Sequence, residues 1–259
     1  MIGAARKLAT FVALVAVLGG LGSQANADLA PHGTDIAGDA NGVNGQGQKT
    51  LTGGPGSTST GPASYAPADL REVFFETPYE AVPVGQDGID YRATGLRIRL
   101  RMEAAPRSDA HTLVYSIVGK FNACNGRLKV HLRGPLSGAG DPADRSLYWA
   151  QATGTCPDGT GDVPMPGSTV TVDAASKELS ITIPLASLSE SHRPYFAPDA
   201  LIAGIGGGGY YDGIRGVVSG LVRSQTDLLV PGIDDTPNMQ DFTIGSDMPS
   251  DVPCTIGCP

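Results

Sequence analysis

Acidic and amide side chains cluster in a glycine-rich stretch near the start of the chain. Asp35, Asp39, Asn41 and Asn44 lie close together there. Calcium takes six to eight hard oxygen ligands from flexible loops, so these residues are candidate calcium ligands, and Asp69 could complete the set. The spacing departs from the EF-hand template, and Asp, Asn and Gly are also ordinary turn residues. The stretch is therefore either a calcium site or a solvated loop.

Basic side chains alternate with apolar ones in two segments, residues 95–102 and 127–133. The cations are Arg97, Arg99 and Arg101 in the first segment, and Arg127, Lys129 and Arg133 in the second. If both segments are strands of one sheet, their exposed faces form a basic patch that could bind an anionic polysaccharide or cell-wall polymer. Alternatively, the cations pair across strands with Glu72, Glu76 and Glu103.

A run of glycines at 204–213 ends in Tyr210, Tyr211 and Asp212. It lacks the Lys-Ser/Thr pair that completes a phosphate-binding loop. Glycines also permit tight bends and close backbone approach. Tyr210, Tyr211 and Asp212 are candidate ligand-binding residues, and the alternative is a purely structural loop.

The common catalytic motifs are not found. The chain contains neither G-x-S-x-G nor H-E-x-x-H. His192 is the histidine most worth testing, because a triad can be assembled from distant residues. A histidine with a purely structural role is the alternative. The sequence predicts no catalytic residues, and a secreted hydrolase ranks third among the functions that we consider.

The first 27 residues have the pattern of a secretory signal. Arg6 and Lys7 precede an apolar run over residues 8–21, and Ala25 and Ala27 supply the small residues of a cleavage site. The apolar run is too short to cross a bilayer as a helix. The alternatives are a membrane anchor or a buried helix. We expect an extracellular protein that begins near Asp28 and has no membrane span after signal removal.

Four cysteines suit an oxidising destination: Cys124, Cys156, Cys254 and Cys258. Three pairings are possible, and we favour Cys124 with Cys156 and Cys254 with Cys258. The first bond would close a loop of roughly 30 residues and stabilise the fold by about 3 kcal/mol. Metal binding by Cys254 and Cys258 would need two further ligands, and no histidine lies near them.

Composition excludes some partners and favours short strands. The net charge of −8 and the pI of about 4.9 argue against nucleic acid and against anionic membranes. The 36 glycines and 20 prolines interrupt the chain too often for long helices.

The pattern of apolar residues predicts an all-β, antiparallel β-sandwich. We expect strands at residues 69–77, 95–102, 111–118, 127–133, 146–153, 169–172, 178–183, 201–205 and 214–222. Residues 173–178 should form a hairpin turn, and Trp149 should anchor the core. The predicted organisation is a signal at 1–27, a flexible Gly/Ser/Asn-rich segment at 28–62, the sandwich at 63–227, and a loosely attached acidic, proline-rich tail at 228–259.

Three short motifs resemble secreted DOMON-like domains. They are D-x-A-G-D at residues 35–39, S-Y-A-P-A-D-L-R-E-V at 64–73, and E-L-S-I-T-I-P-L-A-S-L at 178–188. The resemblance covers residues 35–225 and implies an immunoglobulin-like β-sandwich that binds sugars, or heme in other members, and sometimes calcium. Heme is not carried over, because no axial Met or His is matched. An aromatic content of 6% argues against extensive sugar-stacking surfaces.

We therefore expect a secreted, monomeric, non-catalytic binding or cell-surface-associated module whose partner could be an extracellular polysaccharide. The alternative is a structural or interaction protein of the cell envelope without a small ligand. Calcium is the one cofactor that the sequence suggests.

Overall fold

A computed structural model describes most of the chain after the predicted signal. The described residues are 30–35, 66–84, 88–106, 112–122, 124–133, 144–151, 162–204, 214–221 and 234–249. The signal at residues 1–27 lies outside them. Within these ranges, no helix is both long and apolar enough to span a membrane.

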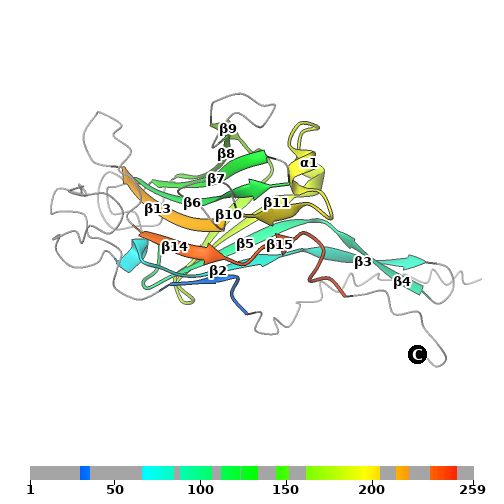
Figure 1. The fold of residues 1–259 in the computed structure, drawn as a ribbon, viewed down its shortest axis with the longest axis horizontal. Coiled ribbons are helices and arrows are strands. Elements are labelled where there is room, and N and C mark those ends of the chain that lie inside the picture. Colours follow the sequence, from blue (N-terminus) through cyan, green and yellow to red (C-terminus); the bar gives the residue numbers. More distant parts are fainter. Residues whose placement is uncertain are drawn as a thin grey trace, which may run out of the picture.

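Antiparallel strands form two sheets that pack face to face (Figure 1). The first sheet has the order β1 (Gly33–Thr34), β2 (Leu70–Glu76), β5 (Gly95–Met102), β11 (Glu178–Pro184) and β10 (Thr169–Asp173). The second has the order β14 (Asp234–Met239), β13 (Ile214–Leu221), β6 (Thr112–Phe121), β7 (Cys124–Arg133), β8 (Asp144–Gln151) and β9 (Val163–Pro164). Two short strands, β12 (Leu201–Ala203) and β15 (Phe242–Thr243), pair with each other beside β6. The predicted all-β sandwich is confirmed.

The strand order is that of a variable-type immunoglobulin domain. The order β2-β5-β11-β10 corresponds to strands A-B-E-D, and β14-β13-β6-β7-β8 corresponds to G-F-C-C′-C″. The strands β1, β9, β12 and β15 are among the additions to this plan. Because many unrelated proteins share the architecture, it defines the class of fold and leaves the function open.

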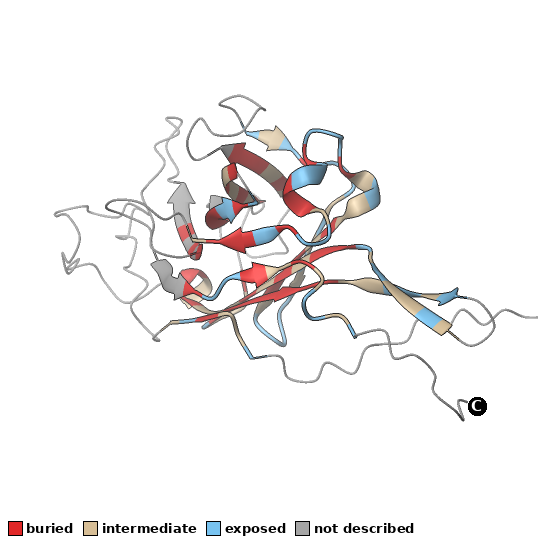
Figure 2. Cartoon of the chain, turned by 45° about the vertical axis from the view of Figure 1, so that its right-hand side comes forward, coloured by how far each residue is buried: buried red, intermediate tan, exposed pale blue. Residues whose placement is uncertain are grey.

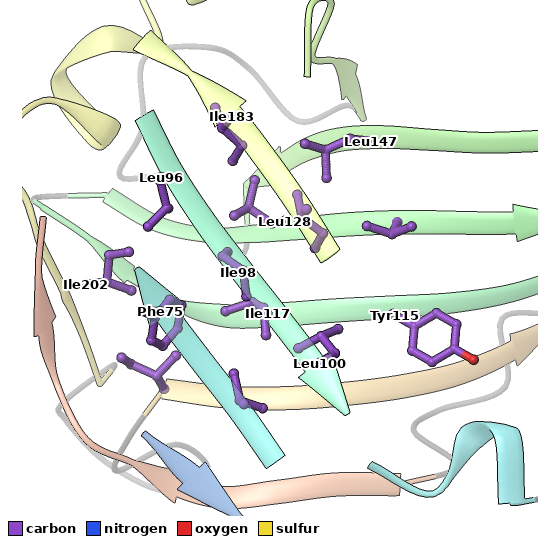
Figure 3. Close-up of a cluster of buried hydrophobic side chains, with 14 of the residues drawn as sticks. Phe75, Leu96, Ile98, Leu100, Tyr115, Ile117, Leu128, Leu147, Ile183 and Ile202 are labelled. Carbon is purple, nitrogen blue, oxygen red and sulfur yellow. The ribbon is translucent and has the colours of Figure 1, made fainter. Parts of the chain in front are cut away.

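Strand β5, in which apolar residues alternate with arginines, lies at the centre of the core. Leu96, Ile98 and Leu100 are buried, while the arginines between them face outward. Strand pairing aligns Ile98 with Phe75 of β2 and Ile181 of β11, so the three strands present one apolar face. That face packs onto side chains of the second sheet, among them those of Ile117 and Leu128 (Figure 3).

Aromatic rings fill one end of the sandwich around Trp149. Its indole stacks on Tyr195 with ring centroids 5.5 Å apart and meets Phe121 and Phe196 edge-on. Tyr195 and Phe196 belong to the short helix α1 (Arg193–Phe196), which follows the short 3-10 helix η2 (Leu185–Ser187). The expectation that Trp149 anchors the core is confirmed.

The turn between β10 and β11 forms where the sequence predicts it. The Asp173 carboxylate accepts hydrogen bonds from the backbone N–H groups of Ala175 and Ser176. Hydrogen bonds from the Ser176 side chain, and then from these backbone groups, lower the pKa of Asp173. Lys177 completes the turn with a φ of 59°. This closure sets the register that aligns Glu178 with Arg101.

The expected C-terminal tail is part of the domain over residues 234–249. Strand β14 pairs with β13, and Met239, Phe242 and Ile244 are buried in the core. The acidic, proline-containing sequence of β14 has low strand propensity, so its pairing with β13 and the burial of Met239 hold it in place. The prediction of a loosely attached tail is therefore wrong for these residues.

Residues 30–35 likewise belong to the domain rather than to a flexible segment. The N–H of His32 donates to the carbonyl of Val73 in β2, and its carbonyl accepts from Gln240 N–H at 2.8 Å. Gly33 lies so close to Met239 that a Cβ atom would overlap that side chain. The His32 ring packs edge-on against Phe75 and Phe242, and its Nδ1 accepts a hydrogen bond from the backbone N–H of Phe75.

A two-stranded ribbon projects beyond both sheets. Strands β3 (Tyr79–Val84) and β4 (Gly88–Ala93) pair only with each other among the described elements. They continue β2 and β5 past Thr94, whose N–H donates to the carbonyl of Pro78 at 2.7 Å. Figures 1 and 2 show this ribbon, hereafter the β3–β4 arm, reaching away from the sandwich with intermediate and exposed residues along its length.

Candidate functional site

The two basic segments lie in different sheets. Arg97, Arg99 and Arg101 are on β5 of the first sheet, and Arg127, Lys129 and Arg133 are on β7 of the second. Because the sheets pack through their inner faces, the outer faces point in opposite directions. The condition for a shared basic patch is therefore not met.

The arginines of β5 are paired with carboxylates on the outer face of the first sheet. Arg99 bonds Glu76 through its Nε, and its Nη1 lies 3.0 Å from Glu178 Oε2. Arg97 Nη1 lies 3.5 Å from a Glu76 oxygen, and Arg101 pairs with Glu72. The outer face of the first sheet therefore carries alternating positive and negative charges. Glu72 and Glu76 pair with arginines of the neighbouring strand, as the second interpretation of the sequence predicts. Glu103 instead pairs with Arg71, at 3.6 Å.

The aromatic ring of Phe74 contacts two arginines of this network. The guanidinium carbon of Arg99 lies 4.4 Å from the centre of the Phe74 ring, and that of Arg101 lies 5.2 Å away. Phe74 is only 3% exposed although it is on the outer face of its sheet. Cation–π contacts and ion pairs therefore hold Arg99 in one conformation. This geometry favours a structural role for Arg99, while Arg97 and Arg101 keep 40% of their side-chain surface exposed.

On the second sheet, one of the three cations of β7 has an ion pair in the described part of the structure. Lys129 Nζ lies 2.7 Å from Asp162 Oδ1. The His131 and Tyr148 rings pack with centroids 4.8 Å apart. The side chain of Arg133 lies outside the described part of the structure.

Of the candidate calcium ligands, the structure describes Asp35 and Asp69. The N–H of Asp35 donates to the carbonyl of Arg71 at 2.9 Å, which places Asp35 beside β2, the strand that follows Asp69 in the chain. Asp69 is fully buried. Asp39 and Asn41 lie outside the described residues. Among those that the structure describes, no group of three or more His, Cys, Asp or Glu residues could hold a metal.

Several predicted residues are outside the described ranges. Tyr210, Tyr211 and Asp212 are among them, as are Cys156, Cys254 and Cys258. Cys124 is buried and its sulfur is disulfide-bonded. Its pairing with Cys156 remains a prediction.

His192 is buried in a local turn. Its Nδ1 lies 2.9 Å from Ser189 Oγ, and its backbone N–H donates to the carbonyl of Ser189. This pattern is a serine turn that precedes helix α1. A Ser-His-Asp triad instead joins serine to Nε2 and leaves Nδ1 for the carboxylate, so the geometry favours a structural role for His192.

Of the three large hydrophobic residues that are exposed within the described ranges, Val84 and Ile89 lie on the β3–β4 arm, which the sequence reasoning missed. Its register aligns Tyr79 with Ala93, Ala81 with Tyr91, and Pro83 with Ile89. Residues directly opposite in a sheet share a face, so these six residues form one apolar face. The rings of Tyr79 and Tyr91 lie on it with centroids 5.4 Å apart, edge to face.

The opposite face of the arm is mixed. It carries Glu80, Val82, Val84, Asp90 and Arg92. Ile89 on the apolar face and Val84 on the mixed face are each 52% exposed. Exposed apolar residues grouped on one element mark a contact surface. We take the apolar face of the arm as the candidate binding surface.

No protein-family model, curated protein or solved structure matches this chain.

Proposed function

We propose that this chain is an exported, non-catalytic binding module of the β-sandwich class, and that it contacts an extracellular polysaccharide with the apolar face of the β3–β4 arm. The observation that carries the proposal is the pair Tyr79 and Tyr91, which stand on one face of a ribbon outside the core. An aromatic ring with a polar hydroxyl is suited to a surface that is apolar at its centre and wet at its rim. The C–H face of a sugar ring has the same character.

Two features of the sequence support the same function. The signal pattern at residues 1–27 would deliver the chain to the compartment where polysaccharides are found. The resemblance to DOMON-like domains implies sugar binding on an immunoglobulin-like sandwich. Calcium, held by Asp35, Asp39, Asn41 and Asp69, is a further proposal that rests on the oxygen-rich sequence of that segment.

Affinity electrophoresis through gels that contain neutral or acidic polysaccharides tests the proposal. We expect one polymer to retard the mature protein, and Tyr79→Ala and Tyr91→Ala to abolish the retardation. Tyr148→Ala is the matched control, because Tyr148 lies on β8 of the second sheet. Equal retardation of all variants would place the sugar elsewhere. If no polymer retards the wild-type protein, the proposal that it binds polysaccharide is wrong.

The second candidate is an interaction protein of the cell envelope without a small ligand. The exposed aliphatic side chains of Val84 and Ile89 favour it, because protein interfaces bury such groups at their centre. Here Ile89→Ser would weaken capture of an envelope protein, while polysaccharide gels would not retard the wild-type chain.

A further inference from the structure

The outer edge of β4 is open for strand pairing. Strand β11 covers β5 as far as Pro184, opposite Gly95, and its last contact is the bond from Leu185 N–H to the carbonyl of Thr94. The chain then turns into η2, so β11 does not extend along β4. In the described ranges, only β3 pairs with β4. The peptide groups of β4 that point away from β3 are available to another strand.

The two edges of the arm are not equivalent. Strand β3 contains Pro83, and a proline in such a ribbon places its nitrogen, which lacks a hydrogen, on the edge away from the partner strand. Strand β4 contains no proline. The edge of β3 is therefore blocked at one position, whereas that of β4 can accept a complete ladder of hydrogen bonds.

We propose that a second copy of this chain pairs with β4 through its own β4, antiparallel, with the two-fold axis at Tyr91. In this register, Asp90 of each copy lies opposite Arg92 of the other, and Ile89 lies opposite Ala93. The result is a four-stranded sheet with the order β3-β4-β4-β3. Pairing of this kind is the edge-to-edge mode of strand addition.

Charge selects this register. An axis at Asp90 would place two aspartates face to face, and an axis at Arg92 would do the same with two arginines. Like charges directly opposite each other destabilise a strand pair, and opposite charges stabilise it. Within one chain, Asp90 and Arg92 already lie on one face, with Arg92 Nε 3.5 Å from Asp90 Oδ2. The axis at Tyr91 therefore gives four alternating charges on that face.

Dimerisation also stabilises the arm and enlarges its binding face. An isolated two-stranded ribbon is marginally stable in water, and four strands are far more stable. A two-fold axis perpendicular to the sheet keeps both copies of the Tyr79–Tyr91 face on the same side. In this respect the inference rests on the proposed function, because the dimer would present two adjacent sites to one repeating polymer and gain avidity.

Charge reversal tests the pairing. Sedimentation velocity over a concentration series should show a monomer–dimer equilibrium for the mature, oxidised protein. Asp90→Arg and Arg92→Asp should each weaken dimerisation about 100-fold, because both place like charges opposite each other. An equimolar mixture of the two variants should form a heterodimer, and the double exchange in one chain should restore the homodimer. A wild-type protein that stays monomeric throughout would overturn the proposal.

Cross-linking at the axis tests the register and does not depend on charge. Opposite Cα atoms in an antiparallel pair are about 4.5–5.5 Å apart, within the range that a disulfide bridges. Tyr91→Cys should therefore form a covalent dimer on oxidation. Ala93→Cys is the control, because its two copies would be about 13 Å apart. Equal yields from the two variants would overturn this register.

These readouts separate the dimer from its ligand. Loss of the dimer in Asp90→Arg with unchanged sugar affinity per chain would leave polysaccharide binding intact and remove the avidity. A dimer that no polysaccharide gel retards would support the pairing and refute the proposed ligand. Asp90→Arg should have the melting temperature of the wild type, because Asp90 is outside the core. A lower melting temperature would mean that this variant loses the dimer because its fold is damaged.

Discussion

The indole ring of Trp149 lies directly over Gly126 of the neighbouring strand. A Cβ atom at position 126 would overlap the six-membered ring of the indole. The glycine therefore sets how closely Trp149 can approach β7. This approach brings the indole into contact with Phe121, Tyr195 and Phe196, so a single missing side chain determines the packing at that end of the sandwich.

Gly126→Ala should lower the free energy of unfolding by about 1–3 kcal/mol, because overpacking a dense core displaces side chains from their preferred conformations. Urea unfolding, monitored by far-UV circular dichroism, measures the change. In a Trp149→Phe background the same substitution should cost less, because the phenyl ring is smaller than the indole. Equal costs in the two backgrounds would show that the glycine is needed for another reason.

Arg99→Leu should destabilise the protein by about 3 kcal/mol. The side chains of Arg99, Glu76 and Glu178 are only 10–13% exposed, and removing one partner from a buried ionic group leaves charge without compensation. Arg92→Leu is the control. Its ion pair is on the arm with 61% of the arginine side chain exposed, so its loss should change stability by no more than about 1 kcal/mol. Chemical denaturation of both variants provides the comparison.

Deleting residues 228–259 should prevent stable folding or lower the melting temperature sharply. Met239, Phe242 and Ile244 are buried, and each buried apolar side chain contributes about 1.5–3 kcal/mol, against a typical total stability of about 5–15 kcal/mol. Deleting residues 250–259 alone is the control, since it removes none of the three side chains. If both deletions have equal effects, these contacts do not stabilise the domain.

Stability should fall as the pH drops below 6.5 because of His32. Burial lowers the pKa of His32 from its ordinary value of 6.5, and the carboxylates of Asp247 and Glu76 only partly oppose this effect. Below pH 6.5 the unfolded chain therefore binds a proton that the folded chain excludes, and the loss stops growing once the pH passes the folded pKa.

Thermal melts across this pH range, with His32→Asn as the control, test the role of His32. The Asn side-chain oxygen can accept the Phe75 N–H bond that Nδ1 accepts in the wild type, and it does not titrate. The variant should lose part of the pH dependence. Identical pH profiles would assign the dependence to other groups.

Millimolar calcium should raise the melting temperature of the mature protein, because an ion that binds only the folded state stabilises that state. Chelator should reverse the shift, and Asp39→Ala should remove it. Unchanged melting of the wild-type protein would identify the glycine-rich segment as a solvated loop.

The sequence predicts those elements whose patterns reflect burial. Strand β5 occurs over the predicted residues 95–102 because alternating apolar and charged residues match the two faces of a half-buried strand. Strand β14 could not be predicted, because its Asp-Asp-Thr-Pro sequence has no strand propensity and tertiary contacts hold it. The arm was missed for a different reason. Prolines at 78 and 83 obscured it, although Asp87-Gly88 between alternating segments is a hairpin signal.

The candidate surface was harder to predict than the fold. Whether Arg97 and Arg127 share a face depends on which strands become neighbours, and alternation within each strand carries no such information. Likewise, Tyr79 and Tyr91 meet only through the register of the arm. Contacts between residues far apart in the sequence therefore determine the surface.

The hydrogen bond between His32 and Gln240 constrains the order of assembly. It joins a residue near the start of the predicted mature chain to one near its end, and Gly33 packs on Met239 in the same place. Residues 30–35, which are synthesised first, must wait for residues 234–249 before this side of the sandwich can close. Closure of this side therefore depends on a non-local contact, and until it forms the ring of Phe75 lacks its stacking partner Phe242.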